Sequence, residues 1–241
     1  MTAALRLTVA VVIMALLSRS ARLAWSNRGV AIAVWRRVRI RHMLGSLALL
    51  VVVGGAAVGL AALVPVTGYG LGTLVGFTGN AVFAPVEEVA VRAGGVSPLT
   101  SPAAGVAMTA VVCAFVLGLA VLFPWLAYVE EQRFRVGLEG VGLAGQVGAA
   151  LRFGLVHLVM LIPLSAALAI AIAGFCYGQV YRRAYRRAWA MAGGDHEVTG
   201  QWVSRSVQQE AAMASTVWHT TFNTLIAGLV VAALLAELTL T

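Results

Sequence analysis

The stretch AGVAMTAVVCAFVLGLAVLFPWLAYVEEQRFR, residues 104–135, decides the fold of this chain. Its first part, residues 104–129, contains no charged residue, and as a helix rising about 1.5 Å per residue it is long enough to cross a hydrocarbon core of about 30 Å. The stretch ends in EEQRFR, and arginines at a helix end indicate the cytoplasmic side of a membrane. The sequence therefore predicts a transmembrane helix whose inner end carries two carboxylates.

The composition extends this assignment to the whole chain. Of its 241 residues, 61% are hydrophobic and 11% are charged, whereas soluble domains contain about 45–50% apolar residues. All 17 basic residues are arginine, and the net charge of +8 reflects arginine clusters beside apolar runs. Several runs of spanning length argue against a nucleic-acid-binding protein. The two cysteines, Cys113 and Cys176, fall in apolar runs, so neither a disulfide scaffold nor a cysteine metal site is indicated.

Residues 1–103 are expected to form an N-terminal membrane region with a basic cytoplasmic segment at 19–43. The apolar stretch 7–17 has the length of a signal-peptide core, but arginines follow it instead of a cleavage site, which predicts an uncleaved, marginal first helix. Residues 30–35 are expected to form part of an interfacial amphipathic helix. The almost wholly apolar stretch 47–66 then predicts a full crossing.

Two further features of this region are an irregular stretch and a histidine. The Gly- and Pro-rich residues 67–103 predict an outer loop with a partial re-entrant piece. His42 lies in the basic flank, where we expect it to be solvated.

Residues 104–241 are expected to form the functional membrane core. Arginines flank both ends of the mostly apolar segment 152–182, and Pro163 interrupts it. If both ends are cytoplasmic, the segment enters as a short half-helix, breaks near Pro163 and returns as a longer helix. The polar stretch 182–212 then predicts a cytoplasmic loop, and the last helix is expected at 213–240. The predicted fold class is an all-α polytopic bundle with a broken or re-entrant helix pair.

This topology would bring four polar residues to the same depth. Glu130 would end one helix at the inner face, His157 would begin another, and His219 with Asn223 would begin the last. Unpaired polar groups in lipid are costly and usually functional. The sequence therefore predicts a membrane-embedded polar chamber near the cytoplasmic surface, provided that the segment before the last helix returns to the side it left.

Three motifs contain these residues: Glu-Glu-x-x-x-Arg at 130–135, Phe-x-x-x-His at 153–157 and His-x-x-x-Asn at 219–223. In this order on successive membrane helices, they resemble the CPBP family, which covers type II CAAX prenyl endopeptidases and bacteriocin self-immunity or Abi proteins. The resemblance covers about residues 104–236. It implies an intramembrane glutamic endopeptidase, in which Glu131, Arg135 and Phe153 of this chain would support the catalytic residues.

The residue types suit peptide hydrolysis. A carboxylate partly removed from water is a better base, so Glu130 with His157 would activate water. His219 and Asn223 lie four residues apart on one helix face, where they could offer two donors to the oxyanion that forms on the carbonyl oxygen. Arg135 could pair with either glutamate and offset their mutual repulsion.

The first motif occurs twice, because Glu87, Glu88 and Arg92 have the same spacing. We favour Glu130, which ends a strong helix and lies closer in sequence to His157. The other copy lies in a stretch broken by Gly and Pro.

Alternatives from other classes remain open. Glu130, His157 and His219 could instead bind zinc in a metalloprotease, or the polar residues could stabilise a non-catalytic immunity or chaperone-like protein. The favoured reading needs no cofactor. Its partners are a membrane-associated peptide or protein substrate and the lipid bilayer, without nucleic acid. The lysine-free, Ala-, Gly- and Arg-rich composition is typical of a GC-rich bacterial genome, which predicts a multi-pass protein of the cell (inner or plasma) membrane and disfavours a prenylated substrate.

Overall fold

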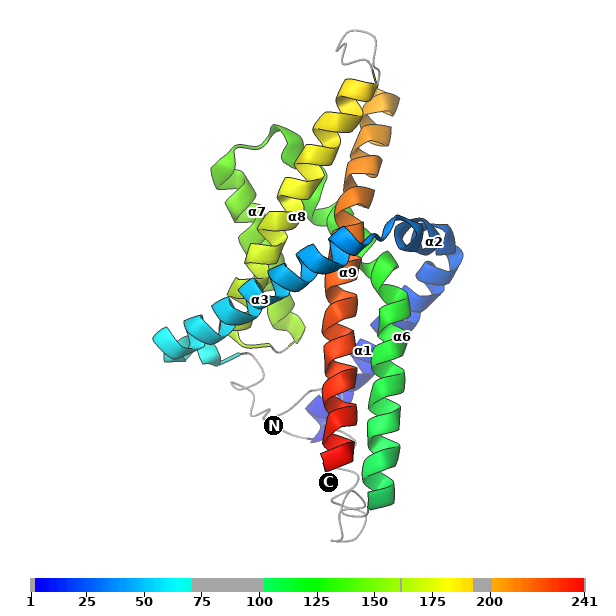
Figure 1. The fold of residues 1–241 in the computed structure, drawn as a ribbon, viewed down its shortest axis with the longest axis vertical. Helices are drawn as coiled ribbons and strands as arrows, with labels where there is room; N and C mark the ends of the chain where they lie inside the picture. The colour runs from blue at the N-terminus through cyan, green and yellow to red at the C-terminus, as the bar shows by residue number, and fades with distance from the viewer. Residues whose placement is uncertain (1–2, 71–101, 161, 193–200, 241) are drawn as a thin grey trace.

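The computed structural model describes residues 3–70, 102–160, 162–192 and 201–240, which are almost wholly helical (Figure 1). A helix satisfies every internal backbone N–H and C=O within its own segment, which lipid requires. In the described part, no named strand occurs, and the all-α polytopic bundle predicted from sequence is confirmed. Five described segments are long and apolar enough to cross a membrane: Ile40–Leu63, Thr109–Arg135, Leu143–Met160, Leu164–Met191 and Ser204–Ala236.

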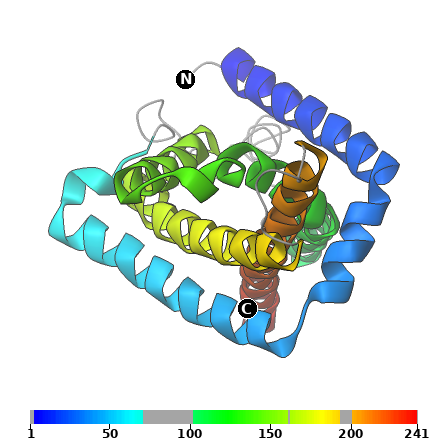
Figure 2. The ribbon, with the colours of Figure 1, turned by 90° about the horizontal axis from the view of Figure 1, so that it is seen from above.

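Three N-terminal helices run around the outside of the bundle (Figure 2). They are α1 (Ala3–Ser26), α2 (Arg28–Arg37) and α3 (Ile40–Leu63). Both α1 and α2 contact α6 (Pro102–Arg135), and α3 crosses α8 (Leu164–Met191) and α9 (Gln201–Leu240). The first helix is longer than the stretch 7–17 that predicted it, and it is not among the five candidate spans. The helices predicted around 30–35 and 47–66 are present as α2 and α3.

The helix α6 does not end at Glu130, where the sequence analysis ended it, but continues to Arg135. No Gly or Pro lies between Glu130 and Gly137, and Gly137 adopts a left-handed conformation with φ of 94°. Arg135 also forms an ion pair with Glu131, one helical turn away. Both carboxylates of the motif therefore project from the last two turns of a continuous helix.

The segment around Pro163 forms the predicted hairpin. The entering helix α7 (Leu143–Val156) continues as the short 3-10 helix η4 (His157–Met160), and α8 returns after the break. Pro163 has no backbone N–H, and the next residue, Leu164, donates its N–H to the carbonyl of Tyr69 at 3.0 Å. The entering helix starts before Arg152, so it is longer than the predicted half-helix.

The stretch 182–212, predicted to be a loop, is largely helical in its described parts, because α8 continues to Met191 and α9 begins at Gln201. The rings of Tyr181, Tyr185 and Trp189 stack in succession along α8 at helical spacing. Small buried residues of α9, Ala211 and Ala212, pack in the same cluster as Tyr181. This packing extends both helices beyond the apolar runs, and α9 starts 12 residues before the predicted Met213.

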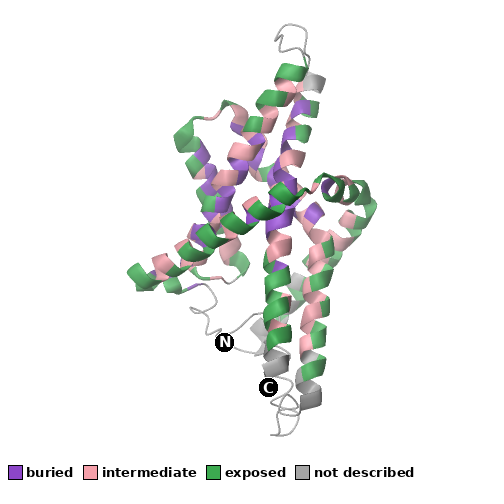
Figure 3. Ribbon diagram, in the orientation of Figure 1, coloured by how far each residue is buried: buried purple, intermediate pink, exposed green. Residues whose placement is uncertain are grey.

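Buried residues concentrate where α7, α8 and α9 meet (Figure 3). One core cluster consists of Val53, Phe153, Ala169, Ala173, Tyr177 and Phe222. Away from it, the surfaces of α3, α6 and α9 expose apolar side chains, among them Val51 (α3), Val121 (α6) and Leu229 (α9). Such surfaces suit lipid contact.

Candidate active site

Three of the four predicted catalytic residues meet in one place. Glu130 projects from α6, His157 lies at the junction of α7 and η4, and His219 lies in the middle of α9. The Oε2 atom of Glu130 lies 4.0 Å from Nε2 of His157 and 3.8 Å from Nε2 of His219. The hairpin of α7 and α8 makes this convergence possible, because it returns the chain to the side of the bundle where α7 began.

Glu130 is partly accessible, and one of its carboxylate oxygens lacks a hydrogen bond. Its side chain is 36% exposed, whereas its Oε2 atom is buried and has no hydrogen-bond partner in the described part of the structure. Two groups that both bond to one water at about 2.8 Å lie roughly 4 to 4.5 Å apart. The two Oε2–Nε2 separations are therefore close to those of a carboxylate and imidazoles that share a water molecule.

Glu131 has the opposite environment, since its side chain is completely buried and surrounded by donors. His219 Nδ1 lies 3.0 Å from Oε1, Ser215 Oγ donates to Oε2 at 2.5 Å, and Arg135 Nε lies 3.2 Å from Oε2. Two hydrogen-bonding groups and one guanidinium cation around two oxygens suit an ionised carboxylate. Glu131 therefore holds His219 and Arg135 in place from within the bundle.

The hydrogen bonds also orient both imidazoles. His157 Nδ1 lies 2.7 Å from the carbonyl oxygen of Phe153, which can only accept, so Nδ1 carries a proton. In the same way, the Glu131 carboxylate accepts from Nδ1 of His219. Each ring consequently presents Nε2 toward Glu130, and the neutral form of each offers a lone pair there.

Phe153 forms the packing centre of the site. Its ring lies 4.8 Å from that of His157 and 5.6 Å from that of His219, measured between centroids. The guanidinium carbon of Arg135 lies 4.5 Å from the Phe153 centroid, within the range of a cation–π contact. A Cβ on Gly174 of α8 would come 2.7 Å from this ring, so only glycine allows this close approach.

Of the predicted catalytic residues, Asn223 makes no described contact with the cluster. Asn223 is half-buried one turn beyond His219 on α9, and no described residue forms a hydrogen bond with its side chain. It shares a helix face with His219 but makes no described contact with Glu130. The second Glu-Glu-x-x-x-Arg copy, at Glu87, Glu88 and Arg92, lies outside the described residues.

Two residues of the site, Ser215 and Tyr177, were not predicted from the sequence. Ser215 Oγ donates to Glu131 and also lies 3.1 Å from the backbone carbonyl oxygen of Tyr177. The ring of Tyr177 stacks on His219 with a centroid distance of 4.8 Å and an interplanar angle of 20°. A signal existed for Ser215, which stands four residues before His219 and so extends its motif by one helical turn. Tyr177 begins a series of aromatic residues spaced by four.

Within the described residues, no group of three His, Cys, Asp or Glu side chains is arranged to hold a metal ion. The Oε2–Nε2 separations of 4.0 and 3.8 Å that join Glu130 to His157 and His219 would have to shorten for zinc–ligand bonds of about 2.0–2.2 Å.

Comparison with known protein families, with curated proteins and with solved structures finds no match to this chain.

Proposed function

We propose that this chain is an intramembrane endopeptidase of the CPBP type, which hydrolyses a peptide bond with a water molecule activated by Glu130. The observation that carries the proposal is the convergence of the unpaired Glu130 Oε2 on the Nε2 atoms of His157 and His219, at 4.0 and 3.8 Å. Carboxylates without a partner are rare inside membrane bundles and are typical of functional sites.

The first step is activation of water by the Glu130 carboxylate and the His157 imidazole. A water between Glu130 and His157 donates one hydrogen to each, because the carboxylate and the neutral imidazole nitrogen both accept. As the water oxygen attacks the peptide carbonyl carbon, its proton passes to Glu130. Glu130 later delivers that proton to the amine that leaves.

The second element is stabilisation of the oxyanion. In its doubly protonated form, His219 keeps Nδ1–H on Glu131 and presents Nε2–H to the developing negative charge. Asn223, one turn along the same helix, supplies a second donor through its side-chain amide. Glu131 and Arg135 are positioning residues, which act through His219 and Phe153.

The chain is a multi-pass membrane protein, and we assign it to the bacterial inner or plasma membrane. Arginines gather at the end where α8 finishes and α9 begins, which by the positive-inside rule is cytoplasmic. The substrate is then a membrane-associated peptide or protein that is cleaved near the cytoplasmic leaflet.

Glu130→Gln tests the proposal most directly. Cells that express the wild-type chain should accumulate new peptide N-termini in their membrane fraction, and Glu130→Gln should remove them while the variant stays folded. Glu87→Gln is the matched control, because it alters the other copy of the motif and should leave cleavage unchanged. Identical cleavage by the Glu130→Gln variant would refute the mechanism.

One observation favours a second candidate, a non-catalytic immunity or chaperone-like protein. Glu131, Arg135 and Phe153 are almost completely buried and packed together, as residues that stabilise a bundle would be. In that case no new N-termini would appear with the wild-type chain, and Glu130→Gln would retain whatever protective effect the wild-type chain has.

A further inference from the structure

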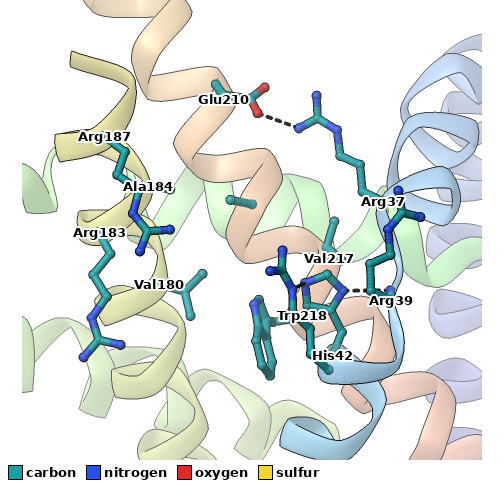
Figure 4. Close-up of a pocket in the computed structure, with 12 residues that line it drawn as sticks. Arg37, Arg39, His42, Val180, Arg183, Ala184, Arg187, Glu210, Val217 and Trp218 are labelled. Atoms are coloured by element: carbon teal, nitrogen blue, oxygen red, sulfur yellow. Dashed lines mark hydrogen bonds and ion pairs between the residues drawn. The ribbon is translucent and has the colours of Figure 1, made fainter. Parts of the chain in front are cut away.

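A second polar region lies apart from Glu130, on the other side of α9. It is a cavity of about 500 Å³ between the α2–α3 corner, α8 and α9, within the usual size range of ligand pockets. Figure 4 shows arginines on both sides of it, with Arg37 and Arg39 from the α2–α3 corner and Arg183 and Arg187 from α8. Arg41 completes a set of five, and the cavity lining contains one carboxylate, that of Glu210.

Most of this positive charge is not neutralised by the protein. Arg37 pairs with Glu210 at 2.8 Å, and Arg39 donates to the backbone carbonyls of Arg36 and Val38. Among the described residues, no acceptor contacts Arg183 or Arg187, which lie one turn apart on α8. Clustered arginines without acceptors repel each other and favour a bound anion.

His42 adds a donor that also lacks an acceptor. Contrary to the expectation from sequence, it is buried, edge-on against Trp218. Its Nδ1 accepts the backbone N–H of Arg39 at 2.9 Å, so in the neutral ring the proton is on Nε2. That Nε2 lies 3.4 Å from Nε of Arg41, which also carries a hydrogen. Two donors that face each other would both be satisfied by one anionic oxygen.

The surroundings indicate the source of the anion. The first turns of α3, directly beside the cavity, expose Ile40, Met43, Leu44 and Leu47. Trp35, just before them, is also exposed, and tryptophans are typical of the membrane–water interface. A molecule with its phosphate in the cavity could therefore lay acyl chains along α3.

We propose that this cavity binds the phosphate of an anionic phospholipid headgroup. Basic pockets between membrane helices at the cytoplasmic surface have the chemistry that recognises such headgroups. The inference is independent of the proposed peptidase activity. Trp218 lines the cavity and its neighbour His219 belongs to the candidate active site, so the bound lipid would lie against the same turn of α9.

The test measures binding by titration calorimetry, with the purified full chain in a neutral detergent. The ligands are dioctanoyl phosphatidylglycerol, dioctanoyl phosphatidylcholine and inorganic phosphate. Phosphatidylglycerol should bind most tightly. The double variant Arg183→Gln/Arg187→Gln should weaken its binding by about 25-fold, from roughly fivefold for each arginine.

The matched control is Arg182→Gln/Arg186→Gln, which removes the same charge from the same helix outside the cavity lining. It should weaken binding by less than about threefold. An equal loss of phosphatidylglycerol affinity in the two double variants would overturn the proposed binding site, since general surface charge would then explain the binding. Phosphatidylcholine or free phosphate binding as tightly as phosphatidylglycerol would overturn the assignment to an anionic lipid.

Glu210→Gln keeps the proposal testable if the arginine variants fail to fold. The Glu210 side chain is 54% exposed, so its replacement should leave the fold intact. It removes the one carboxylate of the cavity lining and releases Arg37, so phosphatidylglycerol should bind about two- to fivefold more tightly. Unchanged or weaker binding would count against the proposal.

Discussion

Replacement by glutamine should affect folding stability very differently at the neighbouring residues Glu130 and Glu131. Glu131→Gln removes the only carboxylate within ion-pair distance of Arg135 among the described residues. Arg135 is completely buried, and its guanidinium nitrogens make no well-aligned hydrogen bond that could replace the lost charge. Breaking one side of a buried ion pair costs about 3–5 kcal/mol of folding free energy. Glu131→Gln should therefore be severely destabilising.

Glu130→Gln is the matched control in the same turn of α6. The side chain is 36% exposed and forms no hydrogen bond through Oε2, so we expect a loss below about 1 kcal/mol. Glu130→Gln should therefore lose catalysis but keep its stability, whereas Glu131→Gln should lose stability.

The assay is unfolding of the purified chain in mixed micelles of neutral detergent and increasing dodecyl sulfate, followed by far-ultraviolet circular dichroism. Adding Arg135→Gln to Glu131→Gln should recover part of the lost stability, because no uncompensated buried charge then remains. If the two single variants lose the same free energy, or if Glu131→Gln lies within about 1 kcal/mol of the wild type, the buried ion pair does not have the role we assign to it.

Three further predictions concern packing, metal and topology. Gly154→Ala should destabilise the chain by about 1–3 kcal/mol in the same unfolding assay, because its Cβ would lie 2.3 Å from the Ala167 carbonyl oxygen. The control is Gly148→Ala on the same helix, whose Cβ would meet nothing within 4 Å. This variant should be more stable than the wild type by about 0.5–1 kcal/mol. Proteolysis should persist in a strong zinc chelator, and activity lost together with stoichiometric zinc would support the metalloprotease alternative. In a cysteine-free background, Gly145→Cys and Ser206→Cys should react with an impermeant thiol reagent only after the inner face is exposed, and labelling of either in intact cells would contradict the proposed orientation.

The local sequence was sufficient to predict the class of the protein and most of its helices. Apolar runs of spanning length have few stable alternatives in lipid, since each must satisfy its backbone internally. Pro163 marked the hairpin break because its missing N–H removes a helix hydrogen bond, although Pro124 is accommodated inside the continuous helix α6. The hairpin then explains why Glu130, His157 and His219, which are distant in sequence, could be predicted to share one level of the membrane.

Tertiary structure decided the features that depend on contacts between helices. Neighbouring residues of a helix point about 100° apart, so the sequence could not tell that Glu130 faces the imidazoles while Glu131 is buried against Ser215. The polar stretch 182–212 has no apolar run, and its described parts are helical where Tyr181 packs with Ala211 and Ala212 of α9. The cavity of five arginines likewise exists only because α3 crosses α8 and α9, since charges separated along the chain become one site only when helices bring them together.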